Sequence, residues 1–483
     1  MTFDQKLTWE HHIKNLILSC QKGLNLLKIL SNKSWGADTT VLLKIYRSII
    51  RSKIDYGCIA YNSATNTILK KLDTVQNSAL RISLGAYRTS PIGSLQCEAS
   101  EPPLSKRRAY LSISYATKIA INRRNPVYNN TFSNRYAQSF RQKSRAHTTF
   151  YERINRYQEH YQVNFSKFFK PDPAPVPPWT IDSPEINTSL SIFNKNDTNH
   201  SLIKVRFQSI LSNLQGYETI YTDASKTENG VAAAVVTRNE TLKFKMPQYS
   251  STFTGELYAI LEALNYILQN KCPQVAIISD SLSAILAIKP IFSQNPIIQR
   301  IKKVLHNIKS LKNKVVIVWV PSHIGIPGNE LADKTARSAI TDPDSKAIKK
   351  SVTYDFGTFI KRKVLSTWQN EWSNSGSKLL EIKPSINPWQ YWPSSRKSQV
   401  ILCRLRIGHT KTTHEYLISK SETPKCNICQ QTISVKHILI DCPVYNIQRQ
   451  RFGLRNTLYA TLNKHLNINN LIGFLKDCNL IDQ

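Results

Sequence analysis

The chain contains 483 residues, of which 41% are hydrophobic, so it is long enough for about three domains with separate cores. Lysine and arginine total 65 against 32 acidic residues, and the resulting formal net charge of +33 attracts polyanions such as nucleic acid, although a basic ribosomal or chromatin-associated protein without chemistry would have a similar composition. No run of eighteen apolar residues occurs and the start, TFDQKLTWEHH, is polar, which excludes a membrane span; we expect a soluble intracellular protein, nuclear or cytoplasmic.

The first 130 residues have the periodicity of a helical bundle. Apolar residues recur three and four positions apart in LILSCQKGLNLLKIL and TTVLLKIYRSIIRSKIDYG, with short polar turns between them. Residues 131–214 differ, because they are basic and aromatic up to residue 170 and rich in proline over 171–184. We predict a linker over 131–214, whose first part either stacks on single-stranded nucleic acid or is a solvated connector.

Residues 215–342 have the pattern of a mixed α/β domain. Three strands are expected first (YETIYTD, VAAAVVT and TLKFKM), and helices and strands then alternate through STFTGELYAILEALNYILQN, VAIISD, SLSAILAI, IIQRIKKVLHNIKSL, VVIVWV and GNELADKTARSAI. This order predicts a central sheet flanked by helices. Residues 343–483 are helical and polar again and end in a cysteine-rich patch, so we predict a C-terminal helical region there.

Four carboxylates of the α/β domain fall where they could converge. Asp223 and Asp280 are expected to end the first and fourth strands, at the sheet edge where α/β proteins bind ligands. Glu256 lies near the start of a helix that Ser251 or its neighbour could cap, and Asp333 lies on the last helix of the domain. Unpaired anions this close repel one another, so the set predicts Mg²⁺ or Mn²⁺ ions at this edge.

Such a cluster suits phosphodiester hydrolysis by two ions about 4 Å apart, one activating water and one stabilising the leaving 3′ oxygen. His323, in the loop PSHIGIPGN, could reach the site and move a proton or loosen a bound metal ion. Each residue alone has an ordinary explanation, since a strand-end Asp is usually a cap and a loop His is usually solvated. Only the complete set favours catalysis.

The motifs YTDAS, TGELYAI, ISDS and VWVPSHIGIPGNELAD occur in this order, and the segment that contains them resembles the RNase H family. The resemblance implies a mixed five-stranded sheet flanked by helices and metal-dependent endonucleolytic hydrolysis of the RNA strand of RNA–DNA hybrids. Position by position, the family's metal ligands match Asp223, Glu256, Asp280 and Asp333, and its mobile loop histidine matches His323. Ala224 stands where many members have glycine, a change that we expect to leave the chemistry intact.

The N-terminal segment resembles the region after the palm of reverse transcriptases from jockey-type non-LTR retrotransposons. The likeness lies in FDQKLTWEHHI, LKIYRSIIRSKIDYG, LDTVQNSALRISLGAYRTSP and EASEPPLSKRRAYL. Polymerisation needs paired aspartates to hold metal, and the sequence has no Asp-Asp pair, so we expect a thumb-like remnant that grips nucleic acid without DNA synthesis. Its basic trio Lys106, Arg107 and Arg108 could contact nucleic acid, although such a run is more commonly a charged helix surface.

A close-spaced set of cysteines and a histidine lies within residues 426–442. Its members are Cys426, Cys429, His437 and Cys442, a tetrahedral set suited to one Zn²⁺, and it resembles the CCHC knuckle at the end of the same retrotransposon class. Bound zinc would fold this tail and present basic residues to RNA or DNA. His409, His414 and the other six cysteines lack ligand spacing, so we expect packing or surface roles for them.

The sequence therefore predicts a retrotransposon-derived protein that hydrolyses the RNA strand of RNA–DNA hybrids and binds RNA and DNA through basic surfaces. One alternative is a non-catalytic nucleic-acid-binding relic of the element. Another is a nuclease of the same fold that cuts DNA, as integrase-like enzymes do, although the string PSHIGIPGNELAD favours RNase H. The oligomeric state cannot be predicted from the sequence.

Overall fold

The computed structural model describes residues 1–133, 148–165, 167–172, 174, 176–181, 184–194, 197–463 and 467–480. They form two compact units. The helical unit combines residues 1–115, 132–162 and 361–483, and the sheet unit combines 116–131 and 163–360. Within the described ranges, every helix is too short or too polar to cross a membrane.

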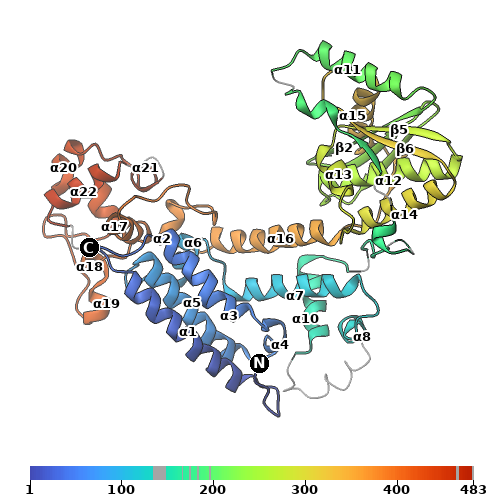
Figure 1. Ribbon diagram of the computed structural model, residues 1–483. Coiled ribbons are helices and arrows are strands. Elements are labelled where there is room, and N and C mark those ends of the chain that lie inside the picture. The colour runs from blue at the N-terminus through green and yellow to red at the C-terminus, as the bar shows by residue number, and fades with distance from the viewer. Residues whose placement is uncertain are drawn as a thin grey trace. The chain divides into compact units, whose positions relative to one another are not determined.

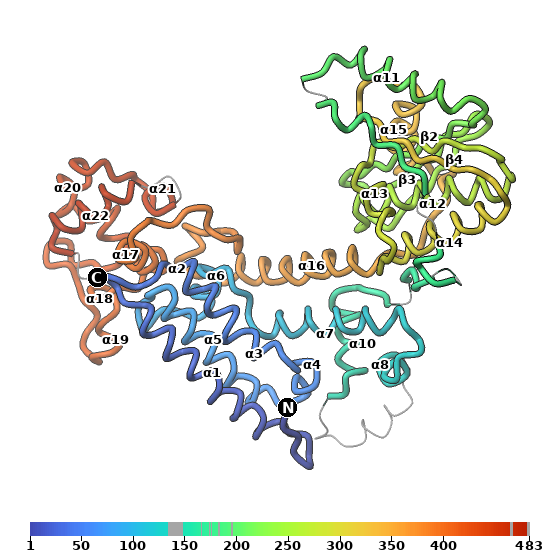
Figure 2. Tube along the Cα trace, in the orientation of Figure 1, coloured from blue at the N-terminus to red at the C-terminus, as the bar shows by residue number. Residues whose placement is uncertain are grey.

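The described residues among the first 161 form helices joined by short loops (Figure 1). They are α1 (Glu10–Leu30), α2 (Thr39–Ile45), the π-helix η1 (Tyr46–Arg51), α3 (Ser52–Asp55), α4 (Cys58–Tyr61), α5 (Asn66–Leu84), α6 (Ile92–Ala99), α7 (Leu104–Ala120), α8 (Tyr128–Phe132) and α10 (Phe150–Tyr161). The long helices α1 and α5 lie side by side, as the trace in Figure 2 shows. The expected helical bundle is therefore present.

The chain after the sheet is helical as well. It contains α16 (Thr353–Ser373), η4 (Lys378–Glu381), α17 (Arg396–Ile407), α18 (Lys411–His414), α19 (Tyr416–Ser419), η5 (His437–Asp441), η6 (Pro443–Tyr445), α20 (Asn446–Arg451), α21 (Leu458–Leu462) and α22 (Ile468–Asp477). Helix α17 contacts both α5 and α6 of the N-terminal part. The N-terminal and C-terminal parts of the chain therefore pack against each other in the helical unit.

One hydrophobic core joins the N-terminal and C-terminal parts of the helical unit. Leu72 and Leu80 of α5 belong to the same buried cluster as Leu402 of α17 and Phe474 of α22. The sequence pattern places these parts in separate regions, 1–130 and 343–483, whereas in the structure they share one core. Periodicity identifies an apolar helix face but not the distant segment that covers it.

Buried arginines of α17 also join the N-terminal and C-terminal parts of the helical unit, because they bind carbonyl groups at the C-terminal end of α5. Arg396 donates hydrogen bonds from Nη1 to the Ser83 carbonyl at 2.8 Å and from Nη2 to the Ile82 carbonyl at 3.2 Å, and Arg404 Nε donates to the Gly85 carbonyl at 2.9 Å. The last carbonyls of a helix lack partners within the helix and carry partial negative charge, so cations stabilise them. The C-terminal segment thereby caps an N-terminal helix.

The sheet unit is built around seven strands in the order β1-β6-β5-β2-β3-β4-β7. The strands are β1 (Glu185–Asn187), β2 (Glu218–Thr227), β3 (Gly230–Val236), β4 (Thr241–Met246), β5 (Gln274–Ser279), β6 (Lys314–Trp319) and β7 (Lys346–Ala347). The expected mixed sheet is confirmed: β2, β3 and β4 are antiparallel, and β5 and β6 run parallel to β2. It has seven strands rather than five, because the short strands β1 and β7 pair parallel with its edges.

Helices cover both faces of the sheet. Residues 178–339 contain the helices α11 (His200–Asn213), α12 (Thr252–Asn270), α13 (Leu282–Ile288), α14 (Pro296–Ser310) and α15 (Pro327–Ala339), with 3₁₀ turns η2 (Pro178–Thr180) and η3 (Ser189–Ile192). In β3, Ala233 packs in the core on the α12 side, whereas its neighbour Ala232 packs with Ala339 of α15. Successive strand residues face opposite sides, so a strand buried on both faces is apolar throughout, as VAAAVV is.

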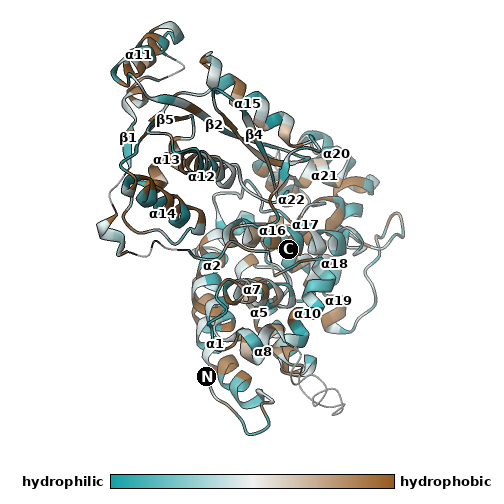
Figure 3. Cartoon of the chain, turned by 90° about the vertical axis from the view of Figure 1, so that its right-hand side faces the viewer, coloured by the Kyte–Doolittle hydropathy of each residue, from teal (hydrophilic) through white to brown (hydrophobic). Residues whose placement is uncertain are grey.

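Helix α14 shows how its sequence pattern produces this covering layer. Its buried residues Ile297, Ile298, Ile301, Leu305 and Ile308 recur at helical spacing, and the brown and teal sides of α14 in Figure 3 follow this pattern. Asn295 caps the helix by accepting a hydrogen bond from the Ile297 N–H, and Pro296 occupies its first position, where a missing N–H costs nothing.

The predicted linker of residues 131–214 contains folded elements in its described part. Helix α10 begins with a capping box between Thr149 and Glu152, and Phe169 belongs to the core of the sheet unit. Strand β1 extends the sheet, and Ile203 and Phe207 of α11 pack against the residues of β6. The three residues of β1 and the two buried apolar residues of α11 give too weak a periodicity to be recognised in a segment that is basic and rich in proline. Residues 134–147 of this predicted linker lie outside the described residues.

Candidate active site and cysteine cluster

The parallel ladder of β2 and β5 positions two of the predicted carboxylates. The ladder's last pair is Thr222 with Ser279, and Asp223 and Asp280 are the next residue on each strand. The carboxyl ends of adjacent parallel strands meet at one edge, so the two side chains start from neighbouring positions. Asp223 does not end its strand as expected, because β2 continues to Thr227 by pairing with β3.

Helix α12 brings the third carboxylate to the same place. Ser251 caps the helix by accepting a hydrogen bond from the Thr254 N–H at 3.2 Å, and Glu256 follows in the first turns. A Cβ added at Gly255 would lie 2.8 Å from the Ala224 Cβ, so glycine allows α12 to approach β2 closely. As a result Glu256 Oε1 accepts a hydrogen bond from the Ala224 N–H at 3.2 Å.

Asp223, Glu256 and Asp280 form a cluster in which one carboxylate oxygen of each lies within 4.8 Å of the others. Asp223 and Glu256 are both buried, at 5% exposure. Oxygen ligands about 2.1 Å from Mg²⁺ in an octahedral site lie roughly 3–4 Å apart. The spacing, the burial and the oxygen chemistry therefore fit a divalent cation of this class.

The surroundings of the same three carboxyl groups raise their pKa values, so that without a cation their charged forms are disfavoured. Burial, followed by the charges of Asp280 and Asp333, raises the pKa of Asp223 to about 7. Burial and then the Asp223 charge raise the pKa of Glu256 well above its ordinary value, and burial raises that of Asp280. One oxygen of Glu256, Oε2, is buried without a hydrogen-bond partner among the residues that the structure describes. A cation at this site would remove these penalties.

Asp333 and His323 lie together near the carboxylate cluster, close enough for the Asp333 charge to contribute, after burial and Asp280, to the raised pKa of Asp223. His323 Nδ1 is 3.8 Å from Asp333 Oδ2, and Arg337 Nε donates to Asp333 Oδ1 at 2.9 Å. The ligand atoms of His323, Asp333 and Glu330 lie within 4.8 Å of one another, and the His323 side chain is 56% exposed. The structure thus brings Asp223, Glu256 and Asp280 into one group and Asp333 with His323 into another.

Sequence reasoning missed two residues of this region. Asn329 Nδ2 donates a hydrogen bond to Asp280 Oδ2 at 3.3 Å, which holds that carboxylate in place. Glu330 joins His323 and Asp333, and its Oε1 accepts from the Gly325 N–H at 3.1 Å. Residues three apart share one helix face, so the spacing of Glu330 and Asp333 in α15 is the signal that could have identified it.

The cysteine set converges as its spacing predicts. The ligand atoms of Cys426, Cys429, His437 and Cys442 all lie within 4.8 Å of one another. Cys426 Sγ is 3.8 Å from Cys442 Sγ, and Cys429 Sγ is 3.4 Å from His437 Nε2. In a tetrahedral site with Zn–S near 2.3 Å and Zn–N near 2.0–2.1 Å, these separations would be about 3.8 and 3.5 Å. The donor set and its geometry fit Zn²⁺.

A tight turn holds the cysteine pair of this set. The Gln430 N–H donates to the Cys426 carbonyl at 2.9 Å with Gln430 in the left-handed region (φ 54°), and Lys425 and Thr432 form a β-bridge. Hydrogen bonding, chiefly from the Cys429 N–H and then from the His437 ring, lowers the pKa of Cys426 to about 6. A thiol of lowered pKa supplies the thiolate that a metal ion requires.

The remaining residues singled out in the sequence have structural partners. Lys106 Nζ lies 2.6 Å from Glu371, Arg107 Nη2 lies 2.8 Å from Asp55, and Arg108 is buried. The basic trio is therefore not an open cationic surface. His409 and His414 are buried and stack at 3.6 Å, as expected for packing roles.

Residues 215–341 match the family model of RNase H. The match covers β2 to α15 and includes all three residues of the buried carboxylate cluster. The chain therefore contains an RNase H domain with an RNase H-like fold. The presence of this domain supports a general class of activity, the hydrolysis of RNA in RNA–DNA hybrids.

Proposed function

We propose that the RNase H domain of this chain is a metal-dependent endonuclease that hydrolyses the RNA strand of RNA–DNA hybrids. The observation that carries the proposal is the convergence of Asp223, Glu256 and Asp280 within 4.8 Å in a buried site with raised carboxyl pKa values. These residues, with Asp333, would hold two Mg²⁺ or Mn²⁺ ions. Bound ions would supply an activated water and charge stabilisation at the leaving oxygen.

The chain's own residues would divide the remaining tasks. Asn329 would orient Asp280 through its hydrogen bond, and Arg337 Nε binds Asp333 Oδ1, whereas His323 Nδ1 lies nearest Asp333 Oδ2. The exposed His323 ring lies at the border of the site, where it can carry a proton between the substrate and solvent. Its left-handed backbone (φ 54°) and that of Gly325 (φ 80°) shape the loop that presents it.

The test is cleavage of an end-labelled RNA–DNA hybrid by the full chain with Mg²⁺. We expect only the RNA strand to be cut, and we expect Asp223→Asn and Asp280→Asn to lose at least about 100-fold in rate, since each removes a metal ligand. Asp344→Asn is the matched control, because Asp344 is exposed and outside the cluster. Binding without cleavage would leave the non-catalytic relic, and cutting of duplex DNA would favour the integrase-like alternative.

We further propose that the cysteine cluster binds one Zn²⁺ and that the whole chain derives from a jockey-type retrotransposon, with the thumb-like remnant and the zinc knuckle contacting RNA or DNA. Metal analysis should find one zinc per chain, lost in Cys429→Ser and retained in Cys478→Ser. Cys478 lies outside the cluster. Equal zinc content in both variants would exclude this site.

A further inference from the structure

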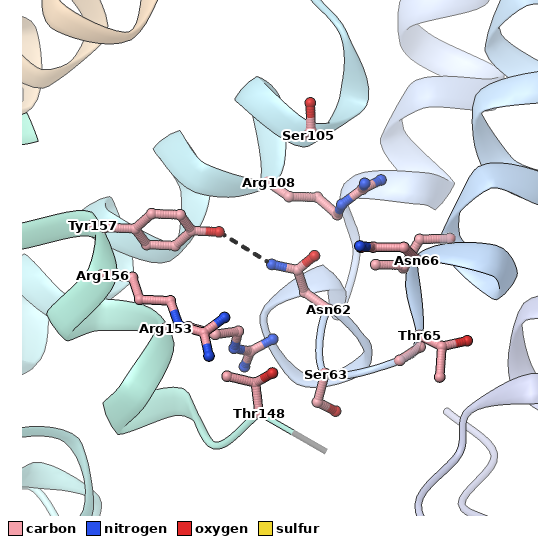
Figure 4. Close-up of a pocket in the computed structure, with 12 residues that line it drawn as sticks. Asn62, Ser63, Thr65, Asn66, Ser105, Arg108, Thr148, Arg153, Arg156 and Tyr157 are labelled. Carbon is pink, nitrogen blue, oxygen red and sulfur yellow. Dashed lines mark hydrogen bonds between the residues drawn. The ribbon is translucent and has the colours of Figure 1, made fainter. Parts of the chain in front are cut away.

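The helical unit contains a polar cavity that the proposed nuclease does not use. Its volume is about 420 Å³, and it is lined by the loop after α4, the start of α5, α7 and α10. Figure 4 shows Arg108 of α7 and Arg153 and Arg156 of α10 gathered around Asn62. Three guanidinium groups at one cavity make it a concentrated positive site within the helical unit.

Two of these arginines are buried with donors unused. Arg108 is 6% exposed and Arg153 is 7% exposed, and within the described part of the chain Nε and Nη1 of both have no hydrogen-bond partner. Arg153 Nη2 is held by the Ile59 carbonyl at 2.7 Å, which fixes the direction of its remaining donors. Buried guanidinium N–H groups without acceptors are costly, so their presence at a cavity wall points to a ligand that supplies acceptors.

Acidic neighbours neutralise this site only in part, through one ion pair between Asp73 and Arg108. Asp73 Oδ1 lies 3.9 Å from Arg108 Nη1, too far for a hydrogen bond, and Asp73 is not a lining residue. Among the described residues, neither Arg153 nor Arg156 forms an ion pair with a carboxylate. The described residues that line the cavity include no acidic side chain.

Neutral polar groups complete the lining. Asn62 Nδ2 donates to the Tyr157 hydroxyl at 3.4 Å, as the dashed line in Figure 4 shows, and Asn66 and Ser105 also line the cavity. Amide and hydroxyl groups can bind a sugar or a base edge, whereas the guanidinium fork matches phosphate oxygens. A cavity of this volume also exceeds the needs of a bare phosphate and is in the range of small-molecule sites.

We propose that this cavity binds the phosphate group of a nucleotide, with Arg108, Arg153 and Arg156 as the phosphate ligands and Asn62 and Tyr157 contacting the attached sugar or base. The nucleotide is either free or the end of a nucleic acid strand, since both present the same group. The proposal does not rest on the nuclease activity, because the cavity lies wholly among residues of the helical unit.

The experiment measures binding of inorganic phosphate, AMP and adenosine to the full chain by calorimetry at physiological salt, with no hybrid present. We expect AMP and phosphate to bind and adenosine not to bind. Arg108→Gln and Arg156→Gln should each weaken AMP binding by about 10-fold or more, the effect of losing a charge-assisted hydrogen bond. Because Arg108 is buried, its variant can lose stability, so the exposed Arg156 decides the matter after its unfolding temperature has been compared with that of the parent.

The matched control is Arg88→Gln, which removes the same charge from an exposed position outside the cavity. Equal binding of AMP and adenosine, or an equal effect of Arg88→Gln and Arg156→Gln, would overturn the proposal. A short single-stranded DNA distinguishes the two sources of phosphate. If its 5′-phosphorylated form binds more tightly than its 5′-hydroxyl form and AMP competes, the ligand is a strand end; if both forms bind equally while AMP binding persists, it is a free nucleotide.

Discussion

At the scale of single residues, Asp223 couples the stability of the fold to pH. Its carboxyl has a folded pKa of about 7 against an ordinary value of 3.8, because burial and nearby carboxylates disfavour the charge. The folded state therefore holds this proton more tightly than the unfolded chain does. The stability that the proton contributes is fully present below about pH 4 and is lost as the pH rises towards 7.

We therefore predict that the Mg²⁺-free protein becomes less stable between pH 5 and pH 8, as judged by its thermal unfolding temperature in buffers without chelator. Adding Mg²⁺ at pH 8 should raise that temperature, since a ligand that binds only the folded state stabilises it. Asp223→Asn is neutral at every pH, so it should flatten the pH dependence, whereas Asp344→Asn should retain it. An unchanged slope in Asp223→Asn would contradict this role of the buried carboxyl.

A second prediction concerns Gly328 in the first turn of α15. A Cβ at this position would lie 2.3–2.5 Å from ring carbons of Tyr221, so we expect Gly328→Ala to lower the free energy of unfolding by about 1–3 kcal/mol. Gly357→Ala is the control, because nothing lies within 4 Å of its added Cβ and it sits within α16. Alanine there should stabilise by about 0.5–1 kcal/mol. Denaturant unfolding of both variants measures these free energies and separates the effect of the contact with Tyr221 from the effect of helix propensity.

Much of the candidate site can be predicted from sequence, because its chemistry depends on residue type and on strand ends. Asp280 follows an apolar strand directly, and Glu256 follows a recognisable cap. The contacts that position these residues cannot be predicted in the same way. The close approach at Gly255, for example, depends on which strand packs against α12. Asn329 was missed for the same reason: its hydrogen bond to Asp280 joins residues that only the folded sheet brings together.

At the scale of elements, the pairing of α6 with α17 depends on a buried ion pair. Arg406 Nη1 lies 3.4 Å from Glu98 Oε1, and the two side chains are 1% and 0% exposed. Arg406 also donates to the Leu462 carbonyl at 2.9 Å and stacks over the Trp389 ring. Removing one partner of a buried pair leaves an uncompensated charge, which is costlier than losing the attraction itself.

Arg406→Met should accordingly lower the free energy of unfolding by about 3–5 kcal/mol. Adding Glu98→Gln to that variant should recover part of the loss, because it removes the stranded charge. Arg451→Met provides the comparison: its pair with Asp477 has the same 3.4 Å separation, but Arg451 is 68% exposed, so we expect a change of at most about 1 kcal/mol. A similar decrease in the free energy of unfolding in Arg406→Met and Arg451→Met would mean that burial of the ion pair does not determine the destabilisation.

The elements themselves were predicted where their pattern is long. Helices such as α1 and α12 and strands β2 to β6 overlap the expected segments, since each shows clear helical or strand character, although several extend beyond them and β2 continues to Thr227. Strand β1 and helix α11 were not expected, because three residues of strand and a basic helix with few buried positions carry little signal. Their structure comes from pairing with β6 and packing against it, which are tertiary effects.

At the scale of the whole molecule, the helical unit consists of segments far apart in the sequence. We predict that a fragment of residues 116–360, which contains all residues of the sheet unit, unfolds cooperatively by itself. A fragment of residues 1–115 should lack fixed packing, because residues 361–483 complete its core. It should bind the dye ANS alone and lose that binding when a 361–483 fragment is added. Cooperative unfolding of residues 1–115 alone would show that the shared core is dispensable.

The shared core also sets an order of events during protein synthesis. Ribosomes add about 5–20 residues per second, so the N-terminal helices emerge tens of seconds before α17 and α22 exist. During that interval the buried cluster to which Leu72 and Leu80 belong still lacks the residues that α17 and α22 contribute to it. The RNase H domain can complete its own fold in the meantime, since its core draws on residues already made. Translation thus completes the RNase H domain before the helical unit, whose core needs residues 361–483.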